Sequence, residues 1–200
     1  YYSGQYLLLE REGAEPAAFS IASAPGEERM IELHILTRDP LTQAVIDYLQ
    51  HHRIARVQVP FGDACLTAPP TQPLVLIAAG TGLAQMQSII EDCLQQGVTQ
   101  PIHLYWGVRH SDDLYNAPHW RRWEQAPNLY LHRVVSDQAD WSGHQGLLHQ
   151  AVCEALTDLA DYRFVVSGSP GMVYATLDAL VAAGMPAQQM QADAFAYAPR

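Results

Sequence analysis

Two patterns of apolar and polar positions divide the chain. In the first part, single apolar residues alternate with polar ones, as at Ile31, Leu33, Ile35, Val57 and Val59. A period of two is typical of antiparallel strands with one buried face. Leu41, Val45 and Leu49 recur instead at helical spacing, which predicts one helix among the strands. We therefore predict that residues 1–66 form part of a small antiparallel β-barrel.

The second part carries continuous apolar runs. Strands are predicted at 74–79, 102–106, 129–135 and 163–167. Amphipathic helices are predicted at 83–96, about 112–124, 146–160 and 171–183. Fully apolar strands separated by helices indicate a parallel sheet covered on both faces. The proline-rich segment 67–73 separates the two patterns, so we predict a barrel domain over residues 1–70 and a parallel α/β domain over 71–200.

Charge and cysteine content narrow the range of partners. The net charge of −10 at pH 7 argues against nucleic acid and anionic membranes, which repel an acidic surface. Cys65, Cys93 and Cys153 form no C-x-x-C pair, so we expect no metal site and a reducing, cytoplasmic location. No apolar run reaches the roughly 18 residues of a membrane span. Because Tyr1 opens the chain within a strand-like pattern, we expect the first barrel strands, and any targeting signal, to be missing.

Glycine-bearing segments follow three of the predicted parallel strands. They are Gly80-Thr81-Gly82, Trp106–Arg109 and Ser167–Met172. The carboxyl ends of parallel strands meet at one rim, where ligands bind. Glycines let the backbone approach phosphates, and the start of a helix stabilises their negative charge. Ser169 as N-cap and Pro170 in the first turn give the last helix such a start. We predict a bound dinucleotide over this rim.

Arg109 follows the second strand, where the adenosine ribose of a dinucleotide is expected. An arginine there can pair with a 2′-phosphate, which favours NADPH. Arg109 can equally be a solvated residue beside Asp112 and Asp113. The choice between NADPH and NADH therefore stays open.

Several segments, in this order along the chain, resemble motifs of the ferredoxin–NADP reductase superfamily. Residues 19–25 are similar to its flavin-binding R-x-[YF]-S-x-x-S segment, and Gly4-Gln5-Tyr6 is similar to the strand before it. Residues 80–84 resemble its pyrophosphate turn, and 167–172 resemble its C-G-x-P-x-M motif. Two further likenesses are the loop Trp141–Gly146, and the ending Asp193–Tyr197, which is similar to the D-A-F-A terminus of NAD(P)H:flavin oxidoreductases.

The resemblance implies a flavin-binding barrel joined to a nicotinamide-nucleotide domain, and a role for each matching residue. Catalytic roles fall on Ser20 near flavin N5, on Ser167 at the position of the family's cysteine, and on Asp193 at the flavin–nicotinamide junction. Cofactor contacts fall on Phe19, Ser20, Ile21, Ala22, Ser23, Gly80, Thr81, Gly82, Arg109, Gly168, Ser169, Pro170, Met172 and Phe195. For Phe195 the alternatives are closure over the ring and packing in the interdomain core.

Four departures from the family's pattern qualify this implication. Ala17 replaces the arginine that clamps a flavin phosphate, and residues 37–42 replace the usual glycine- and serine-rich phosphate turn, with Arg38 as a substitute charge. Ser167 replaces a cysteine, and Gln85 stands at the place of a proline. A bidentate arginine contact is among the strongest to phosphate. The first two departures therefore predict that FAD or FMN is held loosely, as a substrate.

The leading hypothesis is an NAD(P)H-dependent flavin reductase, which passes hydride from NADPH or NADH to FMN, FAD or riboflavin and on to an acceptor. One alternative is the reductase component of a multicomponent oxygenase or ferredoxin-linked chain. The other is a nucleotide-binding subunit without catalysis, which the loss of the arginine at Ala17 would suit.

Overall fold

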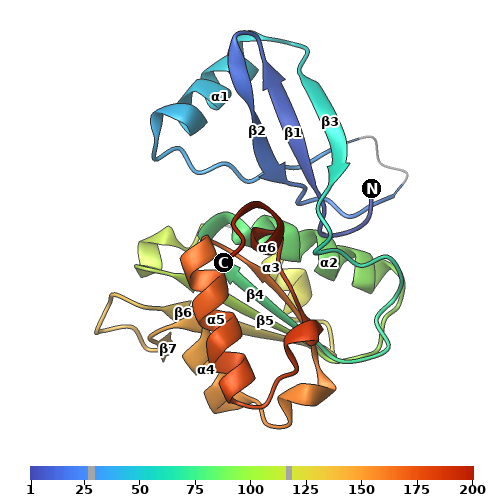
Figure 1. The fold of residues 1–200 in the computed structure, drawn as a ribbon, viewed down its shortest axis with the longest axis vertical. Coiled ribbons are helices and arrows are strands. Elements are labelled where there is room, and N and C mark those ends of the chain that lie inside the picture. Colours follow the sequence, from blue (N-terminus) through green and yellow to red (C-terminus); the bar gives the residue numbers. More distant parts are fainter. Residues whose placement is uncertain (27–29, 116–118) are drawn as a thin grey trace.

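The first part of the chain forms a three-stranded antiparallel sheet in a computed structural model that describes residues 1–26, 30–115 and 119–200 (Figure 1). The strand order is β2-β1-β3. The bounds are Tyr6–Arg11 for β1, Ala14–Ser20 for β2 and Arg56–Phe61 for β3. Helix α1, Pro40–His51, begins at Asp39, whose side chain accepts a hydrogen bond from the Thr42 N–H. The small core between them consists of Leu7, Leu9, Ala17, Ile21 and Val45.

The predicted alternating strand at residues 31–35 is wrong. Only an isolated bridge between Leu33 and Ile21 forms there, while Met30 and Ile31 are 74% and 43% exposed. Period-two alternation needs a neighbouring strand on which to bury its apolar face. The segment is bridged to the residue after β2 at Leu33 alone, although Leu33 and Ile35 both pack against the small core. Strand β3 is present, but its Val57 and Val59 are each 42% exposed.

The second part forms a parallel sheet of order β7-β6-β5-β4-β8-β9. The bounds are Leu74–Ala79 for β4, Ile102–Val108 for β5, Leu129–Val135 for β6, His144–Gln145 for β7, Arg163–Ser167 for β8 and Met190–Gln191 for β9. Alternate residues of β4 enter two cores. Leu74 and Leu76 face helix α2, Leu83–Gln95, whereas Val75 and Ile77 face helices α4, Leu148–Ala155, and α5, Pro170–Ala182. The antiparallel sheet followed by this covered parallel sheet confirms the predicted fold class (Figure 1).

The helices agree with their predicted positions to different degrees. Helix α2 spans Leu83–Gln95 and α5 spans Pro170–Ala182, close to both predictions. Helix α4 covers only Leu148–Ala155. The short 3₁₀ turn Leu159–Asp161 follows it and buries Leu159 instead. The predicted helix at about 112–124 is largely wrong: a 3₁₀ turn at Ser111–Asp113 and the short α3 at Trp120–Trp123 flank residues 116–118, which lie outside the described ranges.

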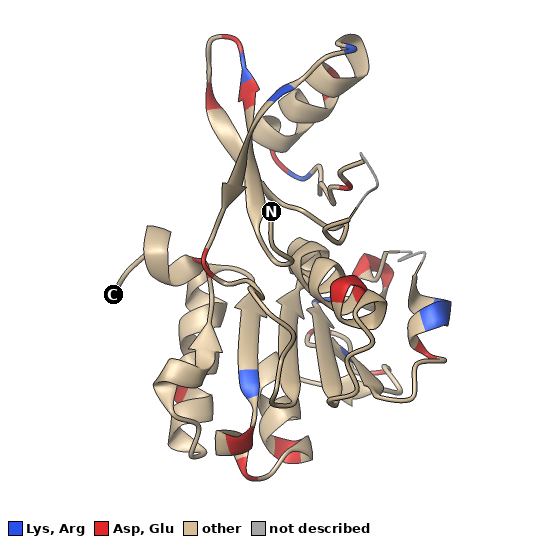
Figure 2. Cartoon of the chain, turned by 90° about the vertical axis from the view of Figure 1, so that its right-hand side faces the viewer, with Lys and Arg blue, Asp and Glu red and all other residues tan. Residues whose placement is uncertain are grey.

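Asp and Glu residues are spread over both parts of the chain (Figure 2). In the described ranges, no helix has the length and apolar character that a membrane crossing requires. The same ranges contain no group of three or more His, Cys, Asp or Glu arranged to hold a metal ion.

Candidate functional site

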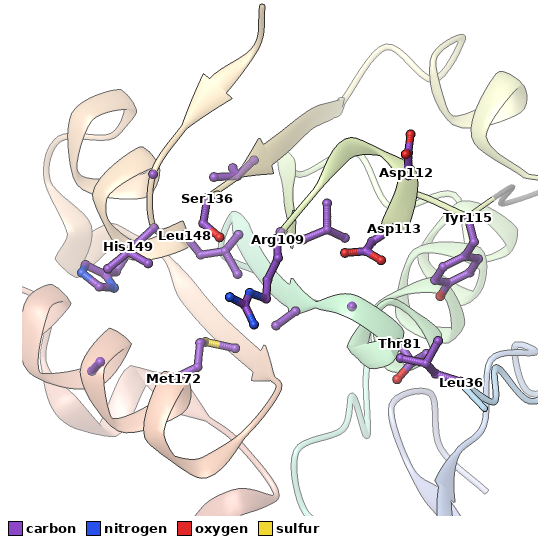
Figure 3. A pocket seen from close by; sticks show the side chains of 18 of the residues that line it. Leu36, Thr81, Arg109, Asp112, Asp113, Tyr115, Ser136, Leu148, His149 and Met172 are labelled. Carbon is purple, nitrogen blue, oxygen red and sulfur yellow. The ribbon is translucent and has the colours of Figure 1, made fainter. Parts of the chain in front are cut away.

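A cavity of about 500 Å³ lies beyond the carboxyl ends of β4, β5 and β6 (Figure 3). Its walls come from the predicted rim segments, and Leu36 and Arg38 reach it from the first part of the chain. Of the predicted cofactor-contact residues, Gly80, Thr81, Arg109 and Met172 lie on its wall. Polar groups also line it, among them Asp112, Asp113, Tyr115, Ser136 and His149. The topology therefore gathers segments from both parts of the sequence around one hollow.

The turn Gly80–Gly82 connects β4 to α2, and Thr81 carries its one side chain. Gly80 has φ +54°, and a Cβ at Gly82 would lie 2.5 Å from the Ser167 carbonyl oxygen. Only glycine therefore fits both the left-handed backbone and the close approach to β8. The Trp106 Nε1–H, from β5, donates to the Gly80 carbonyl over 2.9 Å and so holds the turn against the sheet. Leu83, the first residue of α2, already donates its N–H to the Gly80 carbonyl. The N–H groups that helix geometry leaves without a partner, and that can bind an anion, are therefore those of the 3₁₀ turn Gly80–Gly82 itself.

Arg109 extends over the mouth of this cavity (Figure 3). Its Nε donates to Asp137 Oδ2 over 2.7 Å, and its side chain is 76% exposed. The Ser136 hydroxyl and Arg109 hold the pKa of Asp137 below its usual value. The carboxylate that pairs with Arg109 is thus Asp137, from the end of β6, rather than the nearby Asp112 or Asp113.

The opposite wall joins the two parts of the chain. Arg38 forms an ion pair with Asp113, so its charge is already matched within the protein. Beside it, the Tyr115 hydroxyl lies 2.7 Å from His34 Nδ1. The Tyr115 ring meets Trp106 edge-on at 5.1 Å between centroids. Contacts from the first part of the chain therefore reach the residue that supports the Gly80 turn.

A second cavity, of about 350 Å³, lies between the two sheets. It brings together Ser20 from β2, Ser167 from β8 and Asp193 before α6, Ala194–Tyr197. These are the three predicted catalytic residues, which are far apart in sequence. The rest of its wall consists of Tyr6, Leu8, Ala18, Phe19, Gln85, Val166, Gly168, Val173, Ala194 and Tyr197. Aromatic rings and the polar side chains of Ser20, Gln85, Ser167 and Asp193 thus share one cavity.

Asp193 carries the only carboxylate on the described wall of this second cavity. Its Oδ1 accepts a hydrogen bond from the Ala64 N–H and its Oδ2 accepts one from Gln85 Nε2, both over 3.2 Å. Burial raises its pKa above the usual value, and these hydrogen bonds oppose the rise. A carboxyl whose ionisation is shifted toward neutral pH is suited to hold or release a proton.

Several predicted residues lie elsewhere. Phe195 packs against Tyr174, with 5.5 Å between ring centroids, and is not among the described residues that line either cavity. Phe195 thus packs within the second part of the chain rather than between the two parts, and its closure over a bound ring stays a prediction. Ile21 and Ala22 are fully buried, and their N–H groups already donate to the Gln5 and Glu32 carbonyls. Ser23 Oγ accepts the Glu32 N–H.

The remaining predicted residues form the start of α5. The Ser169 side chain accepts from the Met172 N–H, and Pro170 occupies the first turn, as predicted for a capped helix. Met172 packs over Gly168. Because Gly168 lines the second cavity and Met172 lines the first, this contact lies where the two cavities approach each other.

Sequence patterns missed three residues. Tyr6 and Tyr197 line the second cavity, and Trp106 supports the glycine turn. Tyr6 belongs to the quoted Gly4-Gln5-Tyr6 segment, and Tyr197 closes the quoted terminal one. Their inclusion in those motifs was the available signal, but no spacing rule distinguishes a cavity tyrosine from a packed one.

Comparisons with known proteins agree with this geometry. Residues 76–178 match the family model described as an oxidoreductase NAD-binding domain. The chain is 33% identical to a probable flavin reductase of Aliivibrio fischeri, over 98% of this chain and 86% of that protein. It is 31% identical to the ferredoxin–NAD(P)(+) reductase component of the naphthalene 1,2-dioxygenase system of Pseudomonas putida, over 96% of this chain but only 60% of that protein.

Among solved structures, a cytochrome P450 reductase of Amycolatopsis superposes with a TM-score of 0.84 at 27% identity. The match covers 96% of this chain and 60% of that one. The chain therefore spans most of the flavin reductase but about three-fifths of the oxygenase-linked and P450-linked relatives.

Proposed function

Because the chain belongs to the ferredoxin–NADP reductase superfamily, we propose that it is an oxidoreductase that uses NADH or NADPH to reduce a flavin. When both are bound, the nicotinamide supplies a hydride and the flavin accepts it. The protein's part is to hold the two rings face to face and to keep water out. The observation that carries the proposal is the second cavity, which collects Ser20, Ser167 and Asp193 beside the rim of the first.

The first cavity fits a nicotinamide nucleotide. The Gly80–Gly82 turn offers two glycines and the Thr81 hydroxyl just before α2, where a pyrophosphate would be stabilised. Arg109 and Ser136 would face the adenosine end (Figure 3). The contact of Met172 with Gly168 leads from this rim toward Ser167, which supports a nicotinamide ring placed against the second cavity.

The second cavity suits the ring of a flavin better than its phosphate. Tyr6 and Phe19 offer aromatic surface, and Ser20 offers a hydroxyl. However, Ala17 is buried among Leu7 and Leu9, and Arg38 is paired with Asp113. Neither provides a free cation for a phosphate. This supports a flavin that exchanges with solvent as a substrate, so that riboflavin, FMN and FAD should all serve.

Three roles follow for the chain's own groups. The Ser20 hydroxyl would donate to the ring position that gains charge, and the Ser167 hydroxyl would orient the nicotinamide. Asp193 would hold a proton at the edge of the same cavity.

A cytoplasmic location belongs to this proposal. It is supported by three cysteines that all remain free thiols.

The deciding experiment mixes the purified protein with NADH or NADPH and with riboflavin, FMN or FAD, and follows the loss of the nicotinamide absorbance. We expect oxidation with at least one pairing, at a rate that depends on the flavin concentration. No oxidation above background with any pairing, in protein shown by circular dichroism to be folded, would overturn the proposal.

The oxygenase-linked relative favours a second candidate, a reductase component that passes electrons to a ferredoxin or an oxygenase. That function needs flavin retained through many turnovers. Gel filtration of flavin-loaded protein distinguishes the two candidates: flavin that elutes free favours the reductase of free flavin, and flavin that co-elutes favours the electron-transfer component. A folded protein that binds NADH but turns over no flavin would instead be a nucleotide-binding subunit.

A further inference from the structure

Gln85 lies at the crossing of three segments that meet beside the second cavity. The residue is 1% exposed and comes from the first turn of α2. Its Nε2 donates to the Gly4 carbonyl over 2.9 Å and to the Ala64 carbonyl over 2.8 Å. The same nitrogen lies 3.2 Å from Asp193 Oδ2. All three neighbours accept hydrogen bonds, so the amide is oriented with its NH₂ group toward them.

We propose that Gln85 is a positioning residue that fixes Asp193 in the second cavity and sets its proton affinity through this amide. The inference rests on the proposed function, because it concerns the carboxylate of that same site. An amide nitrogen has two hydrogens, and the two shorter hydrogen bonds, to the Gly4 and Ala64 carbonyls, take one each. Asp193 receives only the longer contact. Its charge is therefore stabilised only weakly by Gln85, and only while the two carbonyls stay in place.

The segment around Ala64 is tied to the parallel sheet at further points. The Ala64 N–H donates to Asp193 Oδ1 over 3.2 Å. Arg163 Nη2, from β8, donates to the Cys65 carbonyl over 3.0 Å. One amide therefore contacts the segment before β1, the Ala64 segment and the carboxylate. A change at Gln85 acts on Asp193 both through the lost contact and through the Ala64 N–H that Gln85 holds in place.

Other groups also act on Asp193 and its neighbours. The Asp63 backbone N–H lowers the pKa of Asp193, and the Asp63 charge raises it to a smaller extent. Burial, and then the Asp193 charge, raise the pKa values of Cys65 and Tyr197, with a further contribution from Tyr6 at Tyr197. None of these groups has a hydrogen bond to Gln85 within the described part of the chain. A Gln85 substitution therefore changes the contact with Asp193 without removing any of these other ionisable side chains.

The test is a titration of the Asp193 carboxyl by NMR, in protein labelled with ¹³C at aspartate Cγ and without added nucleotide or flavin. The Asp193 signal is identified by its loss in Asp193→Asn. We expect Gln85→Leu to raise its midpoint by about 0.5–1 pH unit, since a hydrogen bond to the charged form is lost. Gln85→Glu should raise it further, because a second carboxyl then faces the first.

Ser88→Ala is the matched control. Ser88 lies one turn further along α2, is fully buried, and donates to the Ser23 carbonyl over 2.7 Å. It thus removes another hydrogen bond between the two parts of the chain without touching Asp193. An unchanged midpoint in this control supports the proposal. An equal rise there would show general loosening of the interface and would overturn it.

The pH profile of flavin reduction gives a second readout. The ionisation that disappears in Asp193→Asn should move upward in Gln85→Leu and in Gln85→Glu, but not in Ser88→Ala. An Asp193 NMR midpoint that stays within about 0.2 pH unit of wild type in both Gln85 variants overturns the inference, whether or not the protein reduces flavin. Inactive wild-type protein with shifted NMR midpoints would instead count against the proposed function alone.

Discussion

Ser20 and Ala17 show how differently two residues of one short strand can act. Ser20 lines the cavity between the sheets, whereas Ala17, three positions earlier, is 5% exposed and packs on Leu9 and Val45. The family's arginine at the position of Ala17 has no counterpart here, and the local core has closed over its place. The weak flavin-phosphate binding that we propose therefore follows from a packed core as well as from a missing charge.

Replacing the Ser20 hydroxyl tests its contact with the flavin. Ser20→Ala should lower the rate of hydride transfer about 10- to 100-fold, the usual cost of one hydrogen bond to a group that gains charge. Stopped-flow measurement of flavin reduction gives this rate. Ser142→Ala, in an exposed loop, serves as the control. A rate unchanged by Ser20→Ala would remove Ser20 from the proposed site.

Two neighbouring substitutions test which face of β2 is packed in the core. Ala17→Arg should destabilise the fold by about 2–4 kcal/mol, because it forces a charge into an apolar core. Ala18→Arg should change the free energy of unfolding by less than about 1 kcal/mol, because Ala18 is exposed on the other face. Urea denaturation of both variants checks the difference. Equal stability would show that the side chain of residue 17 can leave the core.

Asp137 sets how much of the Arg109 charge is available at the cavity mouth. Asp137→Asn weakens the pair and removes a negative charge, so it should raise the ratio of kcat/KM for NADPH to that for NADH by roughly 5- to 10-fold. Steady-state kinetics with both nucleotides measures this ratio. The control is Asp140→Asn, an exposed carboxylate in the same loop. An unaltered ratio would place the 2′-phosphate away from Arg109.

At the scale of elements, the β4–α2 connection has the least steric freedom. A Cβ at Gly82 would lie 2.5 Å from the Ser167 carbonyl oxygen, so the glycine turn and the end of β8 pack closely. The start of α5 holds both kinds of glycine: a Cβ at Gly168 would clash with Met172, whereas a Cβ at Gly171 would meet no atom within 4 Å. Gly82 and Gly171 thus look alike in sequence, yet only Gly82 is sterically restricted.

Alanine substitutions at these two glycines test that contrast. Gly82→Ala should weaken NADH binding at least 10-fold and destabilise the protein by about 2–4 kcal/mol, because the turn or β8 must shift. Gly171→Ala should be neutral or stabilise by up to about 1 kcal/mol, from helix propensity. Isothermal titration with NADH and thermal unfolding measure both effects. Normal NADH affinity in Gly82→Ala would mean that the turn can relax at little cost.

At the scale of the whole molecule, the two parts are held together by contacts on either side of the second cavity. Gln85 and Ser88 of α2 donate hydrogen bonds to backbone carbonyls of the first part, and Arg38 pairs with Asp113 beside the first cavity.

On the parallel sheet, a row of stacked rings includes Tyr105 and His132, 4.3 Å apart between centroids. This row affects stability rather than the proposed reaction.

The buried histidine of that row should make stability depend on pH. Burial, with smaller contributions from His103 and His144, lowers the pKa of His132 from 6.5 to about 4. The unfolded chain then takes up a proton below about pH 6.5, while folded His132 stays neutral until about pH 4. The contribution of neutral His132 to the free energy of unfolding is therefore fully present above pH 6.5. It should fall, by on the order of 1 kcal/mol, as the pH drops toward 4.

Urea denaturation at a series of pH values measures this fall. His132→Phe keeps a ring against Tyr105 and should flatten the dependence between pH 6.5 and 4. His51→Gln, at an exposed site on α1, should leave it as in wild type. An equally steep fall in His132→Phe would assign the effect to other groups.

The sequence by itself determined the features that depend on local chemistry. The apolar runs of β4, β6 and β8 and the Ser169–Pro170 start of α5 follow from short-range periodicity and capping. Motif order then determined the fold class and brought Ser20, Ser167 and Asp193 under consideration together.

Only the tertiary structure decided which partners these residues have. It left residues 31–35 without a neighbouring strand, turned Phe195 toward Tyr174 and gave Arg109 the carboxylate of Asp137. It also placed Gln85, which in sequence is merely a departure from a motif, against Asp193. Burial and hydrogen bonding join residues distant along the chain, and no local pattern encodes which of them will meet.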